Sequence, residues 1–327
     1  MREPAFLRQN KDKWLEYERM LFDSDQGKMD PDRLAELYIQ LTDDLAYSRT
    51  FYPKSQTVRY LNGLAARTHL AIYKNKKEKR GRFLTFWTLE LPLIYREAHR
   101  YMLYSMLIFT FTFLIGTFAA YTDEEFLRIV LSDEYVDMTL QNIHNGDPMG
   151  VYKDSPSFPM FVKIAYNNIQ VSFLAFVLGI FCSFGTIYIL FKNGLMLGSF
   201  FMLFHTEGII WEALPVIYIH GTLELSAIVI AGGAGFMLGN SILFPGTHTR
   251  AYSIQKAATA GVKIIVGLIP VFLLAAFLES YITRLTEMPL ANKLIIIILS
   301  LAFVVWYYII YPITITREAG YAVQKNN

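Results

Sequence analysis

The stretch from Pro215 to Phe244 constrains the fold most, because it is apolar enough to lie in a bilayer and still carries two ionisable side chains. His220 and Glu224 are four residues apart, which puts them on one face of a helix. An acidic residue in the middle of a membrane helix costs about 2.5–3.5 kcal/mol on insertion scales. We therefore expect a partner group, a water-filled cavity or a neighbouring subunit to offset that cost.

The apolar residues are concentrated after residue 100, although they make up 54% of the whole chain. Soluble domains contain about 45–50% apolar residues even when glycine is counted. The chain is therefore predicted to be all-α, a polytopic helical membrane bundle with a soluble N-terminal extension. Cys182 is the single cysteine, which excludes a disulfide framework and a multi-cysteine metal site.

Residues 1–82 are predicted to form a cytoplasmic helical head. Asp30 and Pro31 supply a helix N-cap and a first-turn proline, and apolar side chains follow at three-to-four spacing. Amphipathic patterns before and after this helix bring the expected number of helices to three. The head contains no phosphate-binding loop, catalytic constellation or zinc spacing. Lone histidines such as His69 and His99 are expected to be ordinary helix residues.

A dense basic cluster ends the head, just before the first membrane segment. Its cationic members are Lys74, Lys76, Lys77, Lys79, Arg80 and Arg82. Such clusters bind nucleic acid in some proteins, but this position favours anionic lipid on the cytoplasmic side, worth about 1 kcal/mol per charge. Residues 83–100 are rich in aromatic residues and interrupted by charges, so they are predicted to form an interfacial helix that bends at Pro92.

Residues 101–316 are predicted to form the transmembrane domain, with six spans. The segment 121–163 is acidic and is predicted to be an external loop, because positive charge accumulates on the cytoplasmic side. The second span is expected to end at Lys192. For the third, Leu195 to Phe204, a short, tilted or re-entrant helix is the alternative to a full crossing, and six crossings fit the charge pattern best. Six crossings leave both termini in the cytoplasm, with residues 317–327 as a tail.

Five ionisable side chains are expected near the outer ends of the third and fourth spans. They are His205, Glu207, Glu212, His220 and Glu224. One interpretation is structural, with His220 and Glu224 paired to each other or across a subunit interface. Another is a pocket for an ion, a proton or a substrate.

A third interpretation is a zinc site in a metal-dependent membrane hydrolase, built from His205, Glu207, His220 and Glu224. Their spacing matches no known zinc motif. No catalytic residue, bound metal or cofactor is therefore predicted.

Glycines recur in the third and fourth spans at spacings that let helix backbones approach closely. They are Gly194, Gly198, Gly232, Gly235 and Gly239. We interpret them as packing seams, within the bundle or between protomers, rather than as the lining of a permeation path.

Three motifs in a fixed order carry a resemblance to a known family. They are Asn167–Ile180 (NNIQVSFLAFVLGI), Lys192–Gly198 (KNGLMLG) and His220–Ala227 (HGTLELSA). Over roughly residues 100–316, the chain resembles the stage II sporulation protein M family of bacterial and archaeal membrane proteins. The resemblance implies membrane architecture and membership in a complex, and it implies no catalytic residue. The long head and the His-Gly-Thr-Leu-Glu element are similar to the wider, non-sporulation branch of that family.

We therefore expect a non-enzymatic integral membrane protein that acts as a scaffold or a subunit of an envelope complex in the bacterial cytoplasmic membrane. Membrane lipids, further copies of the chain and other envelope membrane proteins are its expected partners, and nucleic acid is not. The alternative is a transporter or permease that uses an ionisable pocket at His220 and Glu224.

Overall fold

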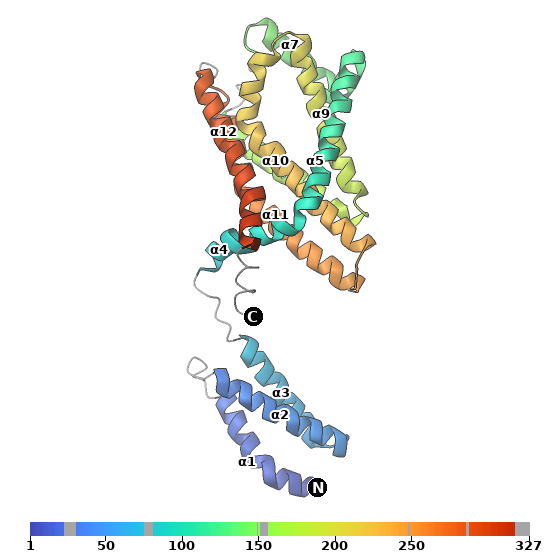
Figure 1. Cartoon of the computed structure of the whole chain (residues 1–327), viewed down its shortest axis with the longest axis vertical. Helices are drawn as coiled ribbons and strands as arrows, with labels where there is room; N and C mark the ends of the chain where they lie inside the picture. The colour runs from blue at the N-terminus through green and yellow to red at the C-terminus, as the bar shows by residue number, and fades with distance from the viewer. Residues whose placement is uncertain are drawn as a thin grey trace. The chain divides into compact units, whose positions relative to one another are not determined.

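The computed structural model describes residues 1–22, 31–74, 81–148, 150, 156–247, 249–285 and 288–317. It divides into two compact units, Met1–Arg82 and Phe83–Asn327, which are considered separately (Figure 1). Every regular element in the described ranges is helical, and six helices of the second unit are long and apolar enough to cross a bilayer. The prediction of an all-α polytopic bundle with six spans is therefore confirmed.

The head is formed by α1 (Glu3–Phe22), α2 (Pro31–Phe51) and α3 (Gln56–Lys74). Their apolar faces meet in one core, made of Phe6, Trp14, Tyr17, Leu37, Leu41, Leu45, Leu61, Leu64 and Ala65. Trp14 is 2% exposed in this core, and its indole Nε1 donates to Asp44 Oδ2 at 2.8 Å. The buried donor is thus satisfied, as folding requires.

The basic cluster is described only at its two ends. Lys76, Lys77, Lys79 and Arg80 lie outside the described residues. Lys74 is the last residue of α3, and Arg82 opens α4 (Arg82–Thr85). Contact between this cluster and lipid stays a prediction.

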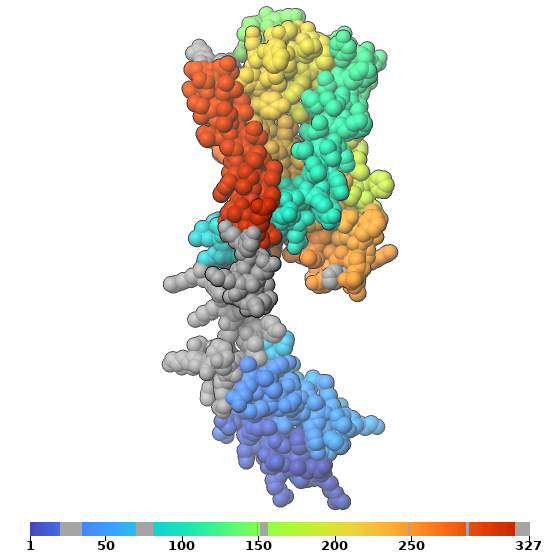
Figure 2. Space-filling view, in the orientation of Figure 1, coloured from blue at the N-terminus to red at the C-terminus, as the bar shows by residue number. Residues whose placement is uncertain are grey.

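The membrane unit consists of six spanning helices in chain order. The first comprises α4, η1 (Phe86–Glu90) and α5 (Leu91–Thr122), and the second comprises α8 (Ser157–Val177) and η3 (Leu178–Ile180). The third and fourth are α9 (Phe184–Thr206) and α10 (Ile210–Leu243). The fifth comprises α11 (Arg250–Phe277) and η4 (Leu278–Ile282), and the sixth begins with α12 (Leu290–Val305) and η5 (Trp306–Ile310). In its most apolar window, α10 is 56% buried and the sixth span 11%, and Figure 2 shows α12 along one edge of the unit.

The third span is a full-length helix, so the short or re-entrant alternative over Leu195–Phe204 is wrong and the preferred full crossing is supported. α9 has 23 residues, about 35 Å at 1.5 Å per residue, which is enough to cross a hydrocarbon core. The second span ends at Ile180 rather than Lys192, and Cys182 and Ser183 turn the chain with φ angles of 51° and 72°. Lys192 therefore lies inside α9, where its exposed side chain can extend along the helix toward the interface.

Residues 83–100 are not a separate helix, because they continue into the first span without a break, and their location at the membrane interface stays a prediction. Leu91, Tyr95 and Ala98 are fully buried in the core of the bundle, so apolar packing holds this segment against its neighbours. The irregularity expected at Pro92 takes the form of η1, a π-helical turn that directly precedes it.

Side chains from the sixth span compensate for the carbonyls that η1 releases. The π-helical hydrogen bonding leaves Trp87 O without its usual backbone partner, and Tyr307 OH donates to it at 2.8 Å. Pro92 has no N–H to offer Thr88 O, and Tyr311 OH donates to that carbonyl at 3.0 Å. These two hydrogen bonds hold the sixth span against the start of the first span.

At η5, in turn, a side chain from the first span compensates for an unpaired carbonyl of the sixth span. Pro312 has no N–H for the carbonyl of Tyr308, and His99 Nε2 lies 2.8 Å from that oxygen. Arg96 lies 3.3 Å from His99 Nδ1, so the neutral ring accepts from the guanidinium and donates to the carbonyl. His99 is therefore a structural residue.

The acidic segment 121–163 is partly helical. α6 (Glu124–Leu131) and α7 (Asp133–His144) pack against the ends of α5 and α9, at the end of the unit opposite α4 (Figure 1). Arg128 bridges Asp133 and Asp137 at 3.2 and 2.8 Å, and these hydrogen-bonded carboxylates raise its pKa.

The five glycines lie at helix crossings within the chain. A methyl group at Gly198 would collide with the backbone of Phe113 and Thr117 on α5. A Cβ at Gly235 or Gly239 on α10 would likewise collide with backbone atoms, whereas at Gly232 on α10 and Gly194 on α9 the nearest atoms are the side-chain hydroxyls of Ser105 and Thr112. Close approach of the neighbouring segments thus explains why glycine stands at these positions.

Candidate functional site

Three ionisable side chains meet inside the membrane unit. His220 and Glu224 come from adjacent turns of α10, and Glu279 comes from η4 at the end of the fifth span. One ligand atom from each lies within 4.8 Å of those of the other two. Since α10 begins at Ile210, His220 lies about 15 Å along it, well inside the span.

Thr283 orients the His220 ring. His220 Nδ1 is 3.3 Å from Thr283 Oγ1, and Thr283 donates its single hydroxyl proton to the carbonyl of Leu278 at 3.2 Å. The hydroxyl therefore accepts from Nδ1–H, which assigns the lone pair to Nε2. Nε2 faces Glu279 Oε2 at 4.0 Å. Both atoms are acceptors in this arrangement, so it requires a proton or a cation between them.

Asn168 from α8 borders the cluster. It is 5% exposed, and its carboxamide is directed at the Glu224 carboxyl. The two groups are within reach but not in hydrogen-bond geometry, and Asn168 Nδ2 has no partner among the described residues. Buried polar atoms are normally paired, so this amide is an unsatisfied donor beside the carboxyl group of Glu224.

The two carboxylates carry an electrostatic cost. At the 4.8 Å limit of their separation, two full negative charges repel by roughly 3–4 kcal/mol at an effective dielectric constant of about 20. The side chains of His220 and Glu279 are only 7% and 16% exposed, so water screens the charges poorly. A shared proton or a bound cation is needed to offset this repulsion. The arrangement can therefore exchange a proton or hold a metal ion.

The helix α7 lies close to this cluster. Burial raises the pKa of Tyr135 to about 12, and the negative charge of Glu279 adds to the increase. Because α7 belongs to the acidic segment 121–163, the cluster lies toward the end of the bundle that carries this segment.

Of the five side chains predicted to gather here, His220 and Glu224 are brought together and the other three are not. His205 and Glu212 are exposed, and Glu207 is half-buried, around the turn between α9 and α10. The four-residue zinc set that the sequence allowed is therefore not assembled. Nor does the structure pair His220 with Glu224 alone, because Glu279 from another span faces the ring.

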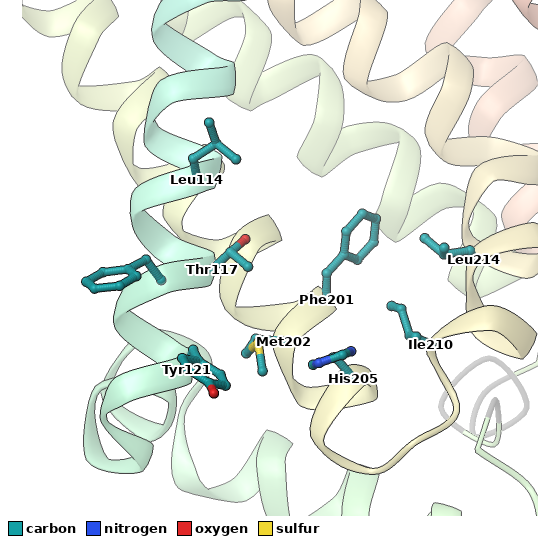
Figure 3. Close-up of a pocket in the computed structure, with 9 residues that line it drawn as sticks. Leu114, Thr117, Tyr121, Phe201, Met202, His205, Ile210 and Leu214 are labelled. Atoms are coloured by element: carbon teal, nitrogen blue, oxygen red, sulfur yellow. The ribbon is translucent and has the colours of Figure 1, made fainter.

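His205 instead lines an apolar groove of about 560 Å³ (Figure 3). The groove lies between α5 and the α9–α10 turn, and its other lining residues are Leu114, Thr117, Phe118, Tyr121, Phe201, Met202, Ile210 and Leu214. His205 is the single ionisable group of histidine or carboxylate type in this lining, so the groove offers no matching ligand set.

Glu279, Thr283 and Asn168 belong to the site but do not stand out as site residues in the sequence. A usable signal existed for Glu279, which is the only acidic residue in the apolar stretch 261–281. A lone carboxylate in such a stretch calls for a partner, as Glu224 does. Nothing in local spacing, however, tells which two spans pack together.

Comparisons with known families cover most of the chain. Residues 105–284 match the family described as Stage II sporulation protein M, and this region includes His220, Glu224 and Glu279. Residues 4–74 match a family described as Domain of unknown function (DUF8413). The comparisons with curated proteins and with solved structures gave no match.

Proposed function

Because the chain belongs to the stage II sporulation protein M family, we propose that it acts as a non-enzymatic scaffold or subunit of a membrane complex in the cell envelope. It is an integral membrane protein with six helices able to span the bilayer. In this proposal it lies in the bacterial cytoplasmic membrane with the head and both termini in the cytoplasm. It associates with itself, with other envelope membrane proteins and, through the basic cluster, with anionic lipid.

The observation that carries this proposal is the exposure of the sixth span. Only 11% of its most apolar window is buried within the chain, against 56% for α10. Ile298 and Leu299 are 62% and 65% exposed, whereas Ser300 is 9% exposed. In a bilayer such an apolar face contacts either lipid or another helix, and within the chain it is almost unused. The glycine seams, by contrast, are occupied by the chain's own helices.

Cysteine crosslinking tests self-association through α12. In a Cys182→Ser background, Ile298→Cys and Leu299→Cys should give crosslinked dimers in native membranes on at least one face of the helix. Ser300→Cys is the matched control, because this neighbouring position is buried and should not crosslink. A monomer by native mass spectrometry in mild detergent, with no crosslink at any exposed position of α12, would contradict the proposal.

A second candidate function is transport of protons or cations. The observation that favours it is the cluster of His220, Glu224 and Glu279, in which the Glu279 side chain keeps 16% exposure. Ionisable groups inside spans commonly mark such pathways. Glu224→Gln should then abolish proton or cation flux into proteoliposomes, while Glu212→Gln, outside the cluster, should leave it unchanged.

A further inference from the structure

We propose that His220, Glu224 and Glu279 bind one divalent first-row transition-metal ion, with Zn²⁺ the best match, and so tie α10 to the end of the fifth span. This inference goes beyond the scaffold role and does not rest on it. The proposed ligands also differ from the zinc set considered from the sequence, because Glu279 replaces His205 and Glu207.

The chemistry of the donors selects the ion. One imidazole nitrogen and two carboxylate oxygens suit Zn²⁺, whereas Mg²⁺ and Ca²⁺ prefer oxygen ligands throughout. A doubly charged cation between two carboxylates gives a neutral assembly. It therefore removes the repulsion between Glu224 and Glu279 that burial makes costly.

The geometry is close to that of a metal site. Zinc lies about 2.0–2.2 Å from nitrogen and oxygen ligands, so tetrahedral ligands are roughly 3.4 Å apart. The three atoms here lie within 4.8 Å of one another, and each must move inward by less than about 1 Å. Side-chain rotation supplies a movement of this size without a change in the backbone.

The tautomer of His220 is already the one that a metal requires. Nδ1 donates to Thr283 Oγ1, and the lone pair of Nε2 faces the Glu279 carboxylate at 4.0 Å. Metal-bound histidines almost always donate their other ring N–H to an oxygen in this way. Thr283 is therefore a positioning residue, held in turn by its bond to Leu278 O.

Asn168 gives an independent indication of a ligand. Its side chain is 5% exposed and directed at Glu224, yet Nδ2 has no partner in the described part of the chain. Rotating the carboxamide by half a turn exchanges Oδ1 and Nδ2, and it gives up the 3.4 Å hydrogen bond that Oδ1 accepts from Asn167 Nδ2. The oxygen would then be available as a fourth ligand, which completes the tetrahedral number that zinc prefers.

Metal titration of the purified full-length chain tests the site. The protein should carry no histidine tag and should be treated with a chelator before Zn²⁺ is added. We expect one Zn²⁺ per chain, a higher thermal midpoint on binding, and no competition from a large excess of Mg²⁺. Glu279→Gln and His220→Asn should each weaken Zn²⁺ binding by at least about tenfold, since each removes a ligand.

Matched variants separate this site from other ligand groups. Glu212→Gln and His205→Asn change the same residue types outside the cluster and should bind Zn²⁺ as the parent does. Thr283→Val should weaken binding about 10–100-fold, and Thr283→Ser should restore it, because only the serine keeps the hydroxyl.

Two results would overturn the inference. One is the absence of stoichiometric Zn²⁺ binding by the parent protein, which would leave a proton as the shared ion. The other is equal binding by the parent and Glu279→Gln. If that variant does not fold, X-ray absorption of the Zn²⁺-loaded parent decides instead. One imidazole with oxygen ligands supports the site, whereas sulfur or a second imidazole excludes it.

Discussion

Gly198 and Gly221 both lie in spanning helices, but their surroundings differ. A Cβ at Gly198 would collide with backbone atoms of α5, whereas the nearest atoms at Gly221 are 3.8 and 4.0 Å away, in ordinary contact. Gly198→Ala should therefore destabilise the bundle by about 1–3 kcal/mol, because the two helices must separate. Gly221→Ala should be neutral or stabilise by up to about 1 kcal/mol through helix propensity. Thermal unfolding in detergent measures both, and equal midpoints would refute this account of the seam.

Glu3 makes the head sensitive to acid. Hydrogen bonds from the hydroxyls of Ser55 and Thr57 lower the pKa of Glu3 from its ordinary value. A carboxyl with a lowered folded-state pKa contributes stability above its unfolded pKa and loses it as the pH falls through the folded value. Glu3→Gln should thus reduce the protection of amides at the start of α3 at neutral pH, and the difference should disappear as the pH falls through the folded-state pKa of Glu3. Hydrogen exchange of the full-length chain checks this, and a difference that persists in acid would contradict it.

The sequence alone points to Glu224 as a site residue but not to its partner Glu279. The polar pair on α10 could be predicted, because an ionisable side chain in a long apolar run is anomalous by itself. Its partner could not, because Glu279 meets α10 only through the packing of the fifth span against the fourth. His205, Glu207 and Glu212 seemed suitable from their position in sequence. They lie around the α9–α10 turn, exposed or half-buried, and none of them joins the cluster.

At the scale of elements, the π-helical turn η1 depends on side chains from the sixth span. Tyr307 OH compensates for the carbonyl of Trp87 at 2.8 Å in a largely buried position, and Tyr311 OH does so for Thr88 at 3.0 Å in an exposed one. Tyr307→Phe should cost about 1–3 kcal/mol, since it leaves a buried carbonyl unpaired. Tyr311→Phe should cost less, because water can reach its carbonyl. Thermal midpoints of the two variants test this ranking, and the reverse order would show that burial does not govern these bonds.

The number of spans was predictable and their boundaries were not. Six apolar stretches of sufficient length are visible in the sequence, and the structure contains six helices of this kind. Lys192 and Gly194 resemble a helix end, but they lie within α9 because the glycine packs against α5. The turn is made by Cys182 and Ser183, which adopt positive φ without glycine or proline. Turn propensities do not predict a turn at Cys182 and Ser183, because tertiary packing imposes their positive φ angles.

At the scale of the whole molecule, an even number of spans puts both ends of the membrane unit on one side of the bilayer. The helices α6 and α7 lie at the opposite end and carry exposed acidic side chains, among them Glu124, Glu125, Asp133, Glu134 and Asp137. The connection between α10 and α11 lies at the same end as α4 and is followed by Arg250 and Lys256. Since positive residues stay in the cytoplasm, this distribution predicts that the head and α4 are inside.

Labelling with a membrane-impermeant maleimide tests that orientation. In a Cys182→Ser background, Glu134→Cys should react in intact cells, because α7 carries it on the outer side. Arg250→Cys and Lys54→Cys, which replace exposed residues of the membrane unit and the head, should react only after the membrane is permeabilised. The opposite pattern would invert the bundle and move the cluster of His220, Glu224 and Glu279 toward the cytoplasmic end. A metal or proton bound there would then exchange with the cytoplasm, so the same labelling fixes which compartment supplies the ion.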